Sequence, residues 1–421
     1  MARPRGQRGT VQKLGRTWRF GYWEPQPDGS RKRIWRGGYA DEQSAHRALR
    51  KVLIQLDEGT YVPVSDETVG EYLTEWLESQ RAHVAANTWV TYRNHVRYYL
   101  APSEELCAKY RERTKTAEHP DGLAKPSLTD VRLQAVDQNR VSRHLAELLQ
   151  RGKRDGTRLS PRTVKGVRIT LKAALSSARQ SGRLLRPIRV RPVSVPKRRP
   201  TVYTPAQTEA FLRIALQDRL AAMWALFVTS AMRPSEVLGL TWEAVDLEAG
   251  DLSIYMKLLM VDGRAVLAEG TKTEDSEAPL MLAAWVVDLL RTWRKMQLEE
   301  RKLWPGTIEE NGLVFTWENG AELKPRWVAR RFKRLAEQAG LPTTVRLYDL
   351  RHGWATAALR AGVHPKLVQE VMRHTDYRTT AETYAHVMPS QSAQAVNIVA
   401  ALFRTTTDEE KSGGNAGEHG K

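Results

Sequence analysis

The chain has 421 residues, and its 66 Lys and Arg residues outnumber its 48 Asp and Glu residues to leave a formal net charge of +18. A hydrophobic content of 41% supports folded cores, and at roughly 100–200 residues per domain the length predicts two to four domains. No apolar run approaches the ~20 residues of a membrane span, and the single cysteine, Cys107, excludes an internal disulfide framework. The charge surplus favours a polyanionic partner, so we expect a soluble intracellular protein that binds nucleic acid.

Residues 1–62 combine a predicted small sheet with a basic surface, since they hold 13 Lys and Arg but 6 Asp and Glu. The alternation from Thr17 predicts a strand, Asp28-Gly29 predicts a hairpin turn, and residues 41–58 predict an amphipathic helix. Basic residues interleave here with tryptophan and tyrosine. This pattern favours a DNA-binding module over a purely structural module whose charged side chains are simply solvated. The predicted DNA contacts are Arg19, Arg31 and Arg33.

Residues 66–185 predict a helical domain. Apolar spacing marks helices from Val69 and from Asn87, Ser160-Pro161 predicts a further helix start, and residues 101–127 lack periodicity and are interpreted as an inserted loop. Residues 151–185 hold 10 Lys and Arg but one acid, and such charges repel one another unless phosphates neutralise them. The predicted DNA contacts are Thr88, Arg93, Arg162, Lys165 and Arg168.

Residues 186–200 contain four prolines, six Lys and Arg and no acid, which predicts a stiff basic linker. Residues 201–403 have an ordinary globular composition, and residues 404–421 form a polar, Gly-rich tail that we expect to be disordered. Strands are predicted across residues 251–281, with a turn at Asp262-Gly263. The predicted helices begin at Thr204-Pro205 and cover residues near 221–231, 283–302, 324–340, 347–361, 365–373 and 380–387.

Four segments of this last domain resemble, in order, the sequence boxes of tyrosine recombinases. Residues 229–246 (TSAMRPSEVLGLTWEAVD) resemble the first arginine box, and residues 271–273 (TKT) resemble the lysine turn. Residues 348–352 (YDLRH) resemble the His-x-x-Arg box, and Arg373-His374 with residues 382–387 (ETYAHV) resembles the histidine and nucleophile segment. Each box alone is weak evidence for the family, but four boxes in this order on a basic chain indicate an integrase of the lambda type.

The resemblance implies a site in which Arg233 and Arg351 clamp a phosphate and Tyr384 is the nucleophile. Guanidinium groups suit this because they stay charged and hold two oxygens as a fork. Lys272 would protonate the leaving oxygen, and His374 would donate to a nonbridging oxygen. Each residue also has a simpler, structural interpretation. Arg233 could pair with Glu236, and Arg351 could be a solvated helix arginine. Lys272 could be an exposed turn residue, His374 could bond to carbonyls at a helix end, and Tyr384 could be a core residue.

Two positions depart from the family pattern. Tyr348 stands where the family has histidine, which leaves open what takes the proton from Tyr384. His352 lies four residues further on the same helix face, but the family has a histidine there too, so it is not interpreted as a replacement. Ala231 and Arg373 occupy places where the family usually has glycine, and Arg373 should disfavour protonation of His374.

The resemblance also implies a multidomain, mainly α-helical fold with small β-sheets. Its parts would be an N-terminal three-stranded sheet plus helix at 1–62 for arm-type DNA sites, a helical core-binding domain of the SAM-like type at 66–185, and a mixed α+β catalytic domain at 201–403. The enzyme would join DNA through a 3′-phosphotyrosyl intermediate, as a homotetramer on double-stranded attachment sites. We expect no cofactor and no metal, partners such as an excisionase or a DNA-bending host protein, and a location in the bacterial cytoplasm at the nucleoid.

Two other functions stay open. A type IB topoisomerase-like relaxing enzyme shares the tyrosine chemistry but needs no module such as residues 1–62. A catalytically inactive DNA-binding regulator is supported only by Tyr348. A resolvase of chromosome dimers fits less well, because such proteins lack the N-terminal module.

Overall fold

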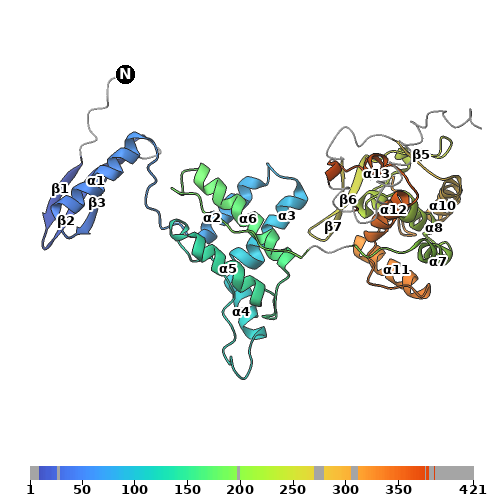
Figure 1. Cartoon of the computed structure of the whole chain (residues 1–421), viewed down its shortest axis with the longest axis horizontal. Helices are drawn as coiled ribbons and strands as arrows, with labels where there is room; N and C mark the ends of the chain where they lie inside the picture. Colours follow the sequence, from blue (N-terminus) through green and yellow to red (C-terminus); the bar gives the residue numbers. More distant parts are fainter. Residues whose placement is uncertain are drawn as a thin grey trace, which may run out of the picture. The chain divides into compact units, whose positions relative to one another are not determined.

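The computed structural model describes residues 9–25, 29–196, 200–269, 279–304, 312–374, 376–378 and 384. The chain forms two compact units, residues 1–197 and 198–421 (Figure 1). None of the described helices combines the length and the apolar composition that a membrane span requires.

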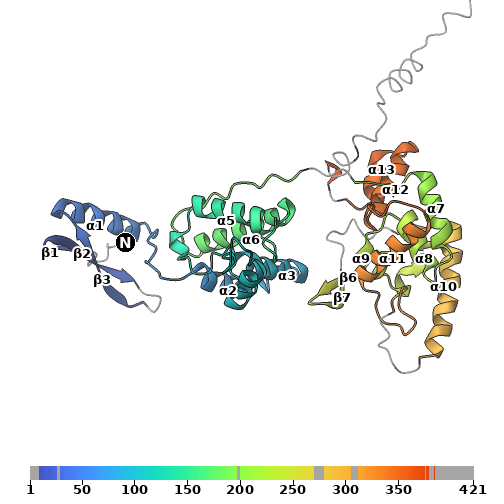
Figure 2. The ribbon, with the colours of Figure 1, turned by 90° about the horizontal axis from the view of Figure 1, so that it is seen from below.

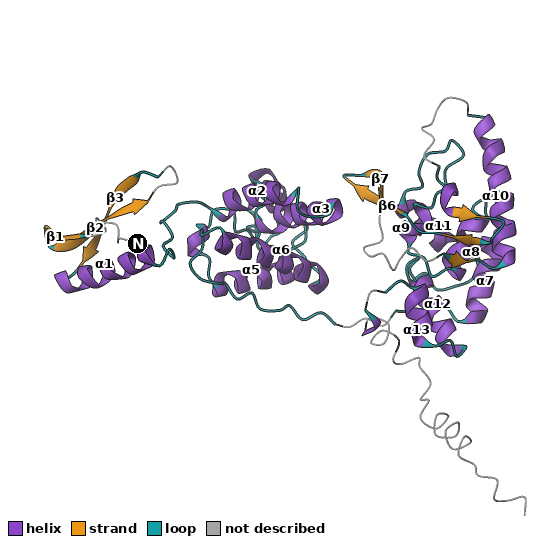
Figure 3. Ribbon diagram, turned by 90° about the horizontal axis from the view of Figure 1, so that it is seen from above, coloured by secondary structure: helices purple, strands orange, loops and turns teal. Residues whose placement is uncertain are grey.

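The first unit begins with a three-stranded antiparallel sheet in the order β1-β2-β3, with one helix packed on it (Figure 3). Phe20 and Tyr22 of the sheet and Leu49 and Val52 of the helix form its small core. The predicted sheet with one helix is confirmed, and Gly59 follows the helix at φ +67°, a conformation that favours glycine. The elements are β1 (Thr10–Leu14), β2 (Thr17–Pro25), β3 (Arg31–Tyr39) and α1 (Glu42–Asp57).

A separate hydrophobic core lies among the helices that follow. The last of these, α6, begins where Ser160 caps the backbone N–H of Thr163, and it buries Val164, Val167 and Leu171 at helical spacing. The predicted start at Ser160-Pro161 is therefore confirmed. The helices are α2 (Val69–Gln80), α3 (Ala86–His95) with its π-helical continuation η1 (Val96–Leu100), α4 (Glu104–Arg113), α5 (Gln138–Arg151) and α6 (Pro161–Gln180).

The interpretation of residues 101–127 as a loop is wrong in part, because α4 lies inside this segment. Ser103 caps α4, and Tyr110 is its one buried residue. A helix with a single buried side chain has no apolar stripe, so the periodicity that marks amphipathic helices is missing from its sequence.

The residues that follow α6 pack partly on the helical core. Ile188, Val190 and Val193 contact it, and Arg168 donates a hydrogen bond to the carbonyl of Val190 at 3.2 Å. The described part of the Pro-rich segment, 186–196, contains no helix or strand.

The second unit is built around α8, whose side chains from Ala222 to Phe227 are all buried. Helices α7, α10 and α12 pack against α8, and α13 packs against α12 (Figure 2). The predicted helix at 221–231 ends at Thr229, because Ala231 is left-handed with φ +51°. The helices are α7 (Pro205–Ala215), α8 (Ala221–Thr229), α9 (Pro234–Leu238), α10 (Ala284–Lys302), α11 (Pro325–Gln338), α12 (Asp349–Arg360) and α13 (Pro365–Val371).

Small antiparallel strands complete this unit. Hairpin β6–β7 turns at Asp262-Gly263, as predicted, and both turn residues have positive φ, 52° and 80°. Lys272 follows this hairpin but lies outside the described residues, as do the tail 404–421 and all of the predicted helix 380–387 except Tyr384. The strands are β4 (Val245–Asp246), β5 (Asp251–Leu252), β6 (Met256–Val261), β7 (Arg264–Glu269) and β8 (Leu280–Met281).

Candidate active site

Arg233 sits at the sharp corner between α8 and α9. Glu236 reaches back from the first turn of α9, where its carboxylate accepts from the Arg233 backbone N–H at 2.7 Å and from Nη1 at 2.6 Å. The side chain of Arg233 remains 35% exposed, so one side of the guanidinium faces solvent. The simpler interpretation of an Arg233–Glu236 pair is thus present, and it holds the arginine in place without covering it.

Arg351 enters the same corner from the first turn of α12. It is 1% exposed, and its Nη1 and Nη2 donate to the carbonyls of Ala231 and Met372. Among the described residues no carboxylate lies within ion-pair distance of this guanidinium, and its Nε has no hydrogen-bond partner. The interpretation of Arg351 as a solvated helix arginine is therefore wrong, because the carbonyls of two loops enclose the side chain.

Arg373 completes a network that joins these two loops. Its Nη2 donates to Glu236 Oε2 at 2.7 Å, and its carbonyl accepts from Arg233 Nη2 at 3.3 Å. The side chain is 6% exposed, and its backbone is left-handed with φ +52°. A non-glycine residue in this conformation costs about 1–3 kcal/mol, so the surrounding contacts must hold it there. Glu236 thus bridges Arg233 and Arg373.

The charges of this corner do not balance. Burial alone would raise the pKa of Glu236, but Arg373 and Arg233 outweigh it and hold that pKa below its ordinary value. Burial, followed by the charge of Arg233, lowers the pKa of Arg351 to about 10. Arg233 and Arg373 therefore share one carboxylate, while Arg351 pairs with none among the described residues, and the corner is an electropositive site suited to an anion with several oxygens.

Tyr384 packs against this corner with its hydroxyl held by a histidine. The residue is 2% exposed, lies in a cluster with Ala231 and Met372, and its Oη is 2.6 Å from Nδ1 of His352. Burial raises the pKa of Tyr384 above its ordinary value, although Arg351 acts against this. Burial also disfavours the charged form of His352 and so lowers its pKa. Near neutral pH the pair is therefore a neutral phenol beside a neutral imidazole.

Tyr348 and His374 lie beside this pair. The Tyr348 ring meets the ring of His352 edge-on at 5.4 Å and is 40% exposed, and its hydroxyl makes no hydrogen bond with the described residues. The backbone of His374 is held by Gln369: its N–H donates to the Gln369 carbonyl, and its carbonyl accepts from the Gln369 side-chain amide. Burial and then the charges of Arg351 and Arg233 lower the pKa of His374 to about 4, so its imidazole is neutral at pH 7.

Of the predicted catalytic residues, the structure brings Arg233, Tyr348, Arg351, His374 and Tyr384 into one region of the second unit, while Lys272 lies outside the described residues. The sequence alone did not reveal two features of this site: the carboxylate of Glu236 that Arg233 and Arg373 share, and the contact of His352 with Tyr384. The four-residue step from Tyr348 to His352 was the one available signal for the last of these.

Two of the three predicted DNA contacts of the N-terminal sheet stack on one tryptophan. Arg19 and Arg33 lie over the ring of Trp35, with 4.5 and 4.8 Å from guanidinium carbon to ring centroid. Arg31 is exposed at the start of β3. Such stacking holds guanidiniums in place while leaving them open to a phosphate.

In the helical part of the unit the predicted contacts lie on α3 and α6, which pack against each other. Arg93 lies over Trp89 at 5.0 Å, and Thr88, the residue before Trp89, is half-buried. On α6, Arg162 and Lys165 are exposed, while Arg168 is half-buried by its bond to Val190. Within the described ranges no group of three or more His, Cys, Asp or Glu could hold a metal ion.

Comparisons with known proteins find a matching family and similar individual proteins. The phage integrase family matches residues 202–391. A XerC-like tyrosine recombinase of Caldanaerobacter subterraneus is 25% identical over 384 residues, which cover 86% of this chain and 90% of that protein. The ICEBs1 integrase of Bacillus subtilis is 21% identical over 194 residues, 46% of this chain and 52% of that protein.

Solved structures share the fold along most of the chain. The Tn1549 transposon integrase in complex with circular intermediate DNA has a TM-score of 0.59 at 20% identity, covering 79% of this chain and 99% of that one. A lambda integrase tetramer bound to a Holliday junction has a TM-score of 0.50 at 14% identity, covering 93% and 97%. The family match over residues 202–391, the relative along nearly the whole chain and the shared fold together support a tyrosine recombinase integrase.

Proposed function

We propose that this chain is a site-specific DNA recombinase that integrates and excises a mobile element. The observation that carries the proposal is the corner in which Arg351, buried with no carboxylate partner among the residues that the structure describes, lies beside a tyrosine whose hydroxyl contacts a neutral histidine. A buried cation without a counterion stabilises the fold poorly, whereas it suits a site where an anion binds.

The arginines would hold the scissile phosphate. Arg233 keeps an exposed side while Glu236 fixes its direction, and Arg351 is held by two backbone carbonyls. Attack on a phosphodiester places additional negative charge on the nonbridging oxygens. Donors fixed in advance in a buried site stabilise that charge more strongly than water does, because they need no reorganisation.

Tyr384 would attack the phosphorus, so that the new bond joins its Oη to phosphorus while the bond from phosphorus to the 5′-oxygen breaks. The phenol is protonated at neutral pH and needs an acceptor. With its own proton on Nε2, the neutral imidazole of His352 accepts the phenol proton at Nδ1, 2.6 Å away. The product is a 3′-phosphotyrosyl link, which a DNA 5′-hydroxyl of the partner duplex reopens without a nucleotide cofactor.

The remaining roles follow the same reasoning. Lys272 would protonate the departing 5′-oxygen, and the neutral His374 would donate to a nonbridging oxygen. Tyr348, whose hydroxyl lies on an exposed ring, would donate a hydrogen bond to the phosphate instead of acting as a base. Arg373 touches no reacting atom in this scheme and acts on Arg233 through Glu236.

The rest of the chain would position DNA around this site. Residues 66–185 and 201–403 would bind the core site as two domains joined by the segment 186–200, and the sheet of residues 1–62 would bind separate arm sites and raise avidity through its tether. We propose a homotetramer that exchanges strands through a four-way junction in the bacterial nucleoid, with an excisionase or a DNA-bending host protein setting direction.

The decisive experiment is trapping on a nicked suicide duplex that carries the element's attachment site. Wild type should form an adduct that survives SDS, whereas Tyr384→Phe should form none, because the phenol oxygen is the attacking atom. Tyr377→Phe removes an exposed hydroxyl from the same segment and should leave the adduct unchanged. Absence of an adduct with wild type on a verified site would refute the catalytic proposal and favour a DNA-binding regulator.

A relaxation assay separates recombination from topoisomerase activity. A type IB-like enzyme would relax a supercoiled plasmid that lacks attachment sites, whereas the recombinase should act only on plasmids that carry them.

A further inference from the structure

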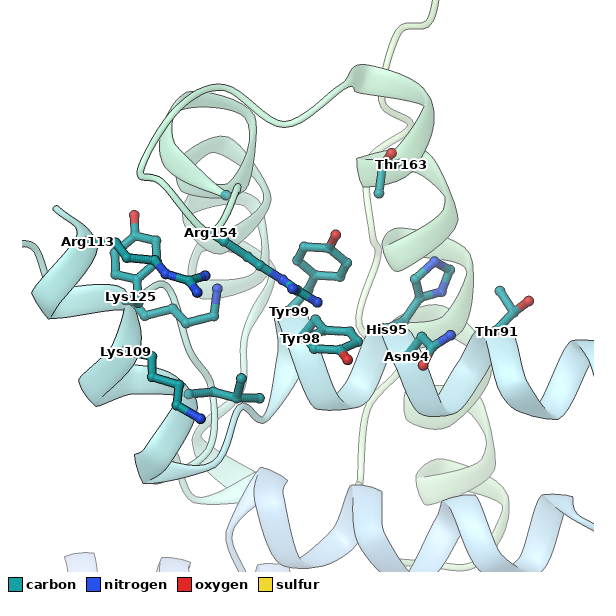
Figure 4. A pocket seen from close by; sticks show the side chains of 13 residues that line it. Thr91, Asn94, His95, Tyr98, Tyr99, Lys109, Arg113, Lys125, Arg154 and Thr163 are labelled. Atoms are coloured by element: carbon teal, nitrogen blue, oxygen red, sulfur yellow. The ribbon is translucent and has the colours of Figure 1, made fainter. Parts of the chain in front are cut away.

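A basic pocket of about 630 Å³ lies in the first unit, whereas Tyr384 belongs to the second. Its walls come from α3 with η1, from α4, from the loop after α5 and from the start of α6. Figure 4 shows side chains of these elements pointing into one space. Part of the wall, including α4 and Lys125, belongs to residues 101–127, the segment that the family resemblance does not cover.

Four cationic side chains line this pocket, and no carboxylate is among the lining residues. Lys109 is paired with Glu105, but Arg113, Lys125 and Arg154 have no ion-pair partner among the described residues. Cations gathered in a half-enclosed space repel one another, and removing them from water adds a cost. An anion that enters the pocket reduces this repulsion, so the arrangement favours anion binding.

Aromatic rings hold two of these cations in place. Arg154 lies over Tyr98 at 5.1 Å, and Lys125 lies over Tyr110 at 4.8 Å. Tyr110 in turn is fixed by its hydroxyl, which donates to the carbonyl of Arg151 at 2.6 Å. Burial lowers the pKa of Lys125, which indicates an ammonium partly removed from water. A ring-held cation is a better anion ligand than a free surface lysine, since less side-chain entropy is lost on binding, and for Lys125 less solvent is displaced as well.

The pocket also holds neutral hydrogen-bond donors. Asn94 and Thr91 on α3 face it, together with Thr163 at the start of α6 (Figure 4). Cations combined with amide and hydroxyl donors match the oxygens of a phosphodiester. Arg162 and Lys165, exposed on α6 close to Thr163 in the sequence, extend the positive charge beyond the pocket.

We infer that this pocket is an additional phosphate site, in which Arg113, Lys125 and Arg154 hold one backbone phosphate of bound duplex DNA away from the scissile position. The inference rests on the proposed function, because it presumes that the chain acts on DNA. In this arrangement the inserted segment supplies affinity and not chemistry, so its loss weakens binding without slowing cleavage of DNA that is already bound.

The test measures binding of the full-length protein to a fluorescent duplex of random sequence over a series of salt concentrations. Each phosphate contact contributes about 0.9 to the slope of log affinity against log salt. The double variant Lys125→Met with Arg154→Gln should lower the slope by about 0.9 and weaken binding several-fold at low salt. The single variant Arg154→Gln changes only an exposed side chain and serves if the double variant unfolds.

Lys115→Gln is the matched control, since it removes a cation of the same segment that does not line the pocket and is paired with Glu112. Its slope should stay at the wild-type value. Equal slopes for the pocket variant and this control would overturn the inference. Tight binding of thymidine monophosphate to the DNA-free protein, lost in the pocket variant, would also overturn it by showing a free nucleotide as the ligand.

Adduct formation on the suicide duplex keeps the two proposals apart. At saturating protein the pocket variant should form the covalent adduct at the wild-type rate. A slower rate at saturation would overturn the inference by placing the pocket in the catalytic step. Failure of wild type to form an adduct would refute the proposed function, whereas the salt slopes would still decide the phosphate site.

Discussion

The N-terminal sheet and the second unit hold arginine side chains in opposite ways. On the sheet, Arg19 and Arg33 stack on Trp35 and remain accessible to solvent, so their charges stay hydrated. In the second unit, Arg351 and Arg373 are buried, and Glu236 is the carboxylate that neutralises part of their charge. The first arrangement suits distributed phosphate binding, which is weak per contact and sensitive to salt. The buried arginines of the second unit concentrate positive electrostatic potential at one point, which suits stabilisation of a transition state.

The largest expected effect of this contrast is at Arg351. Arg351→Lys keeps the positive charge but cannot reach the carbonyls of Ala231 and Met372 together with a phosphate, because an ammonium lacks the guanidinium fork. We expect single-turnover cleavage to slow by about 10²–10³-fold, the usual effect of losing one fixed donor. Arg360→Lys, at the exposed end of the same helix, is the control and should cleave normally. A loss of less than about threefold at position 351 would contradict a buried clamp.

The second effect is on pH dependence and tests whether His352 takes the phenol proton. Its pKa lies below the ordinary 6.5, so the imidazole is neutral at pH 7 and becomes charged only as the pH falls through that lowered value. Cleavage at saturating protein should fall about tenfold per pH unit below that point. His352→Gln should cleave more slowly at pH 7 and should lack this acid limb. An unchanged limb in the variant would assign the proton to another group.

Arg373→Gly should separate two roles of this residue: holding Glu236 in position, and tolerating a strained left-handed backbone. Glycine relieves the left-handed backbone but removes one of the two cations on Glu236, so we expect cleavage about tenfold slower without a loss of thermal stability. Arg373→Lys should restore part of the rate by returning the charge. Ala231→Gly relieves the other left-handed corner without changing charge, and its rate should stay within about twofold of wild type. Equal rates for wild type and Arg373→Gly would show that Glu236 needs only Arg233.

The smallest effect belongs to the sheet. Arg33→Gln should lower the salt slope of DNA binding by about 1 and weaken affinity a few-fold, with no change in the cleavage rate at saturating protein. Arg50→Gln on α1, an exposed cation away from Trp35, is the matched control. If both variants behave alike, the stacked pair has no special part in DNA binding.

Local pattern sufficed for most elements of the fold. Cap residues marked helix starts at Ser160 and Thr204, and the Asp262-Gly263 turn follows from the positive φ that both residues adopt. Helix α4 escaped prediction because Tyr110 is its one buried side chain, and without an apolar stripe no period is visible.

By itself, the sequence determined the order of the elements, the excess of positive charge and the four boxes that carry Arg233, Lys272, Arg351, His374 and Tyr384. Only the tertiary structure decided how these side chains are held. The bond between Arg233 and the carbonyl of Arg373 spans 140 positions, and that between His352 and Tyr384 spans 32. Periodicity and capping act over a few residues, whereas such contacts depend on how helices and corners pack, so a shared Glu236, a buried Arg351 and a basic pocket leave no local trace.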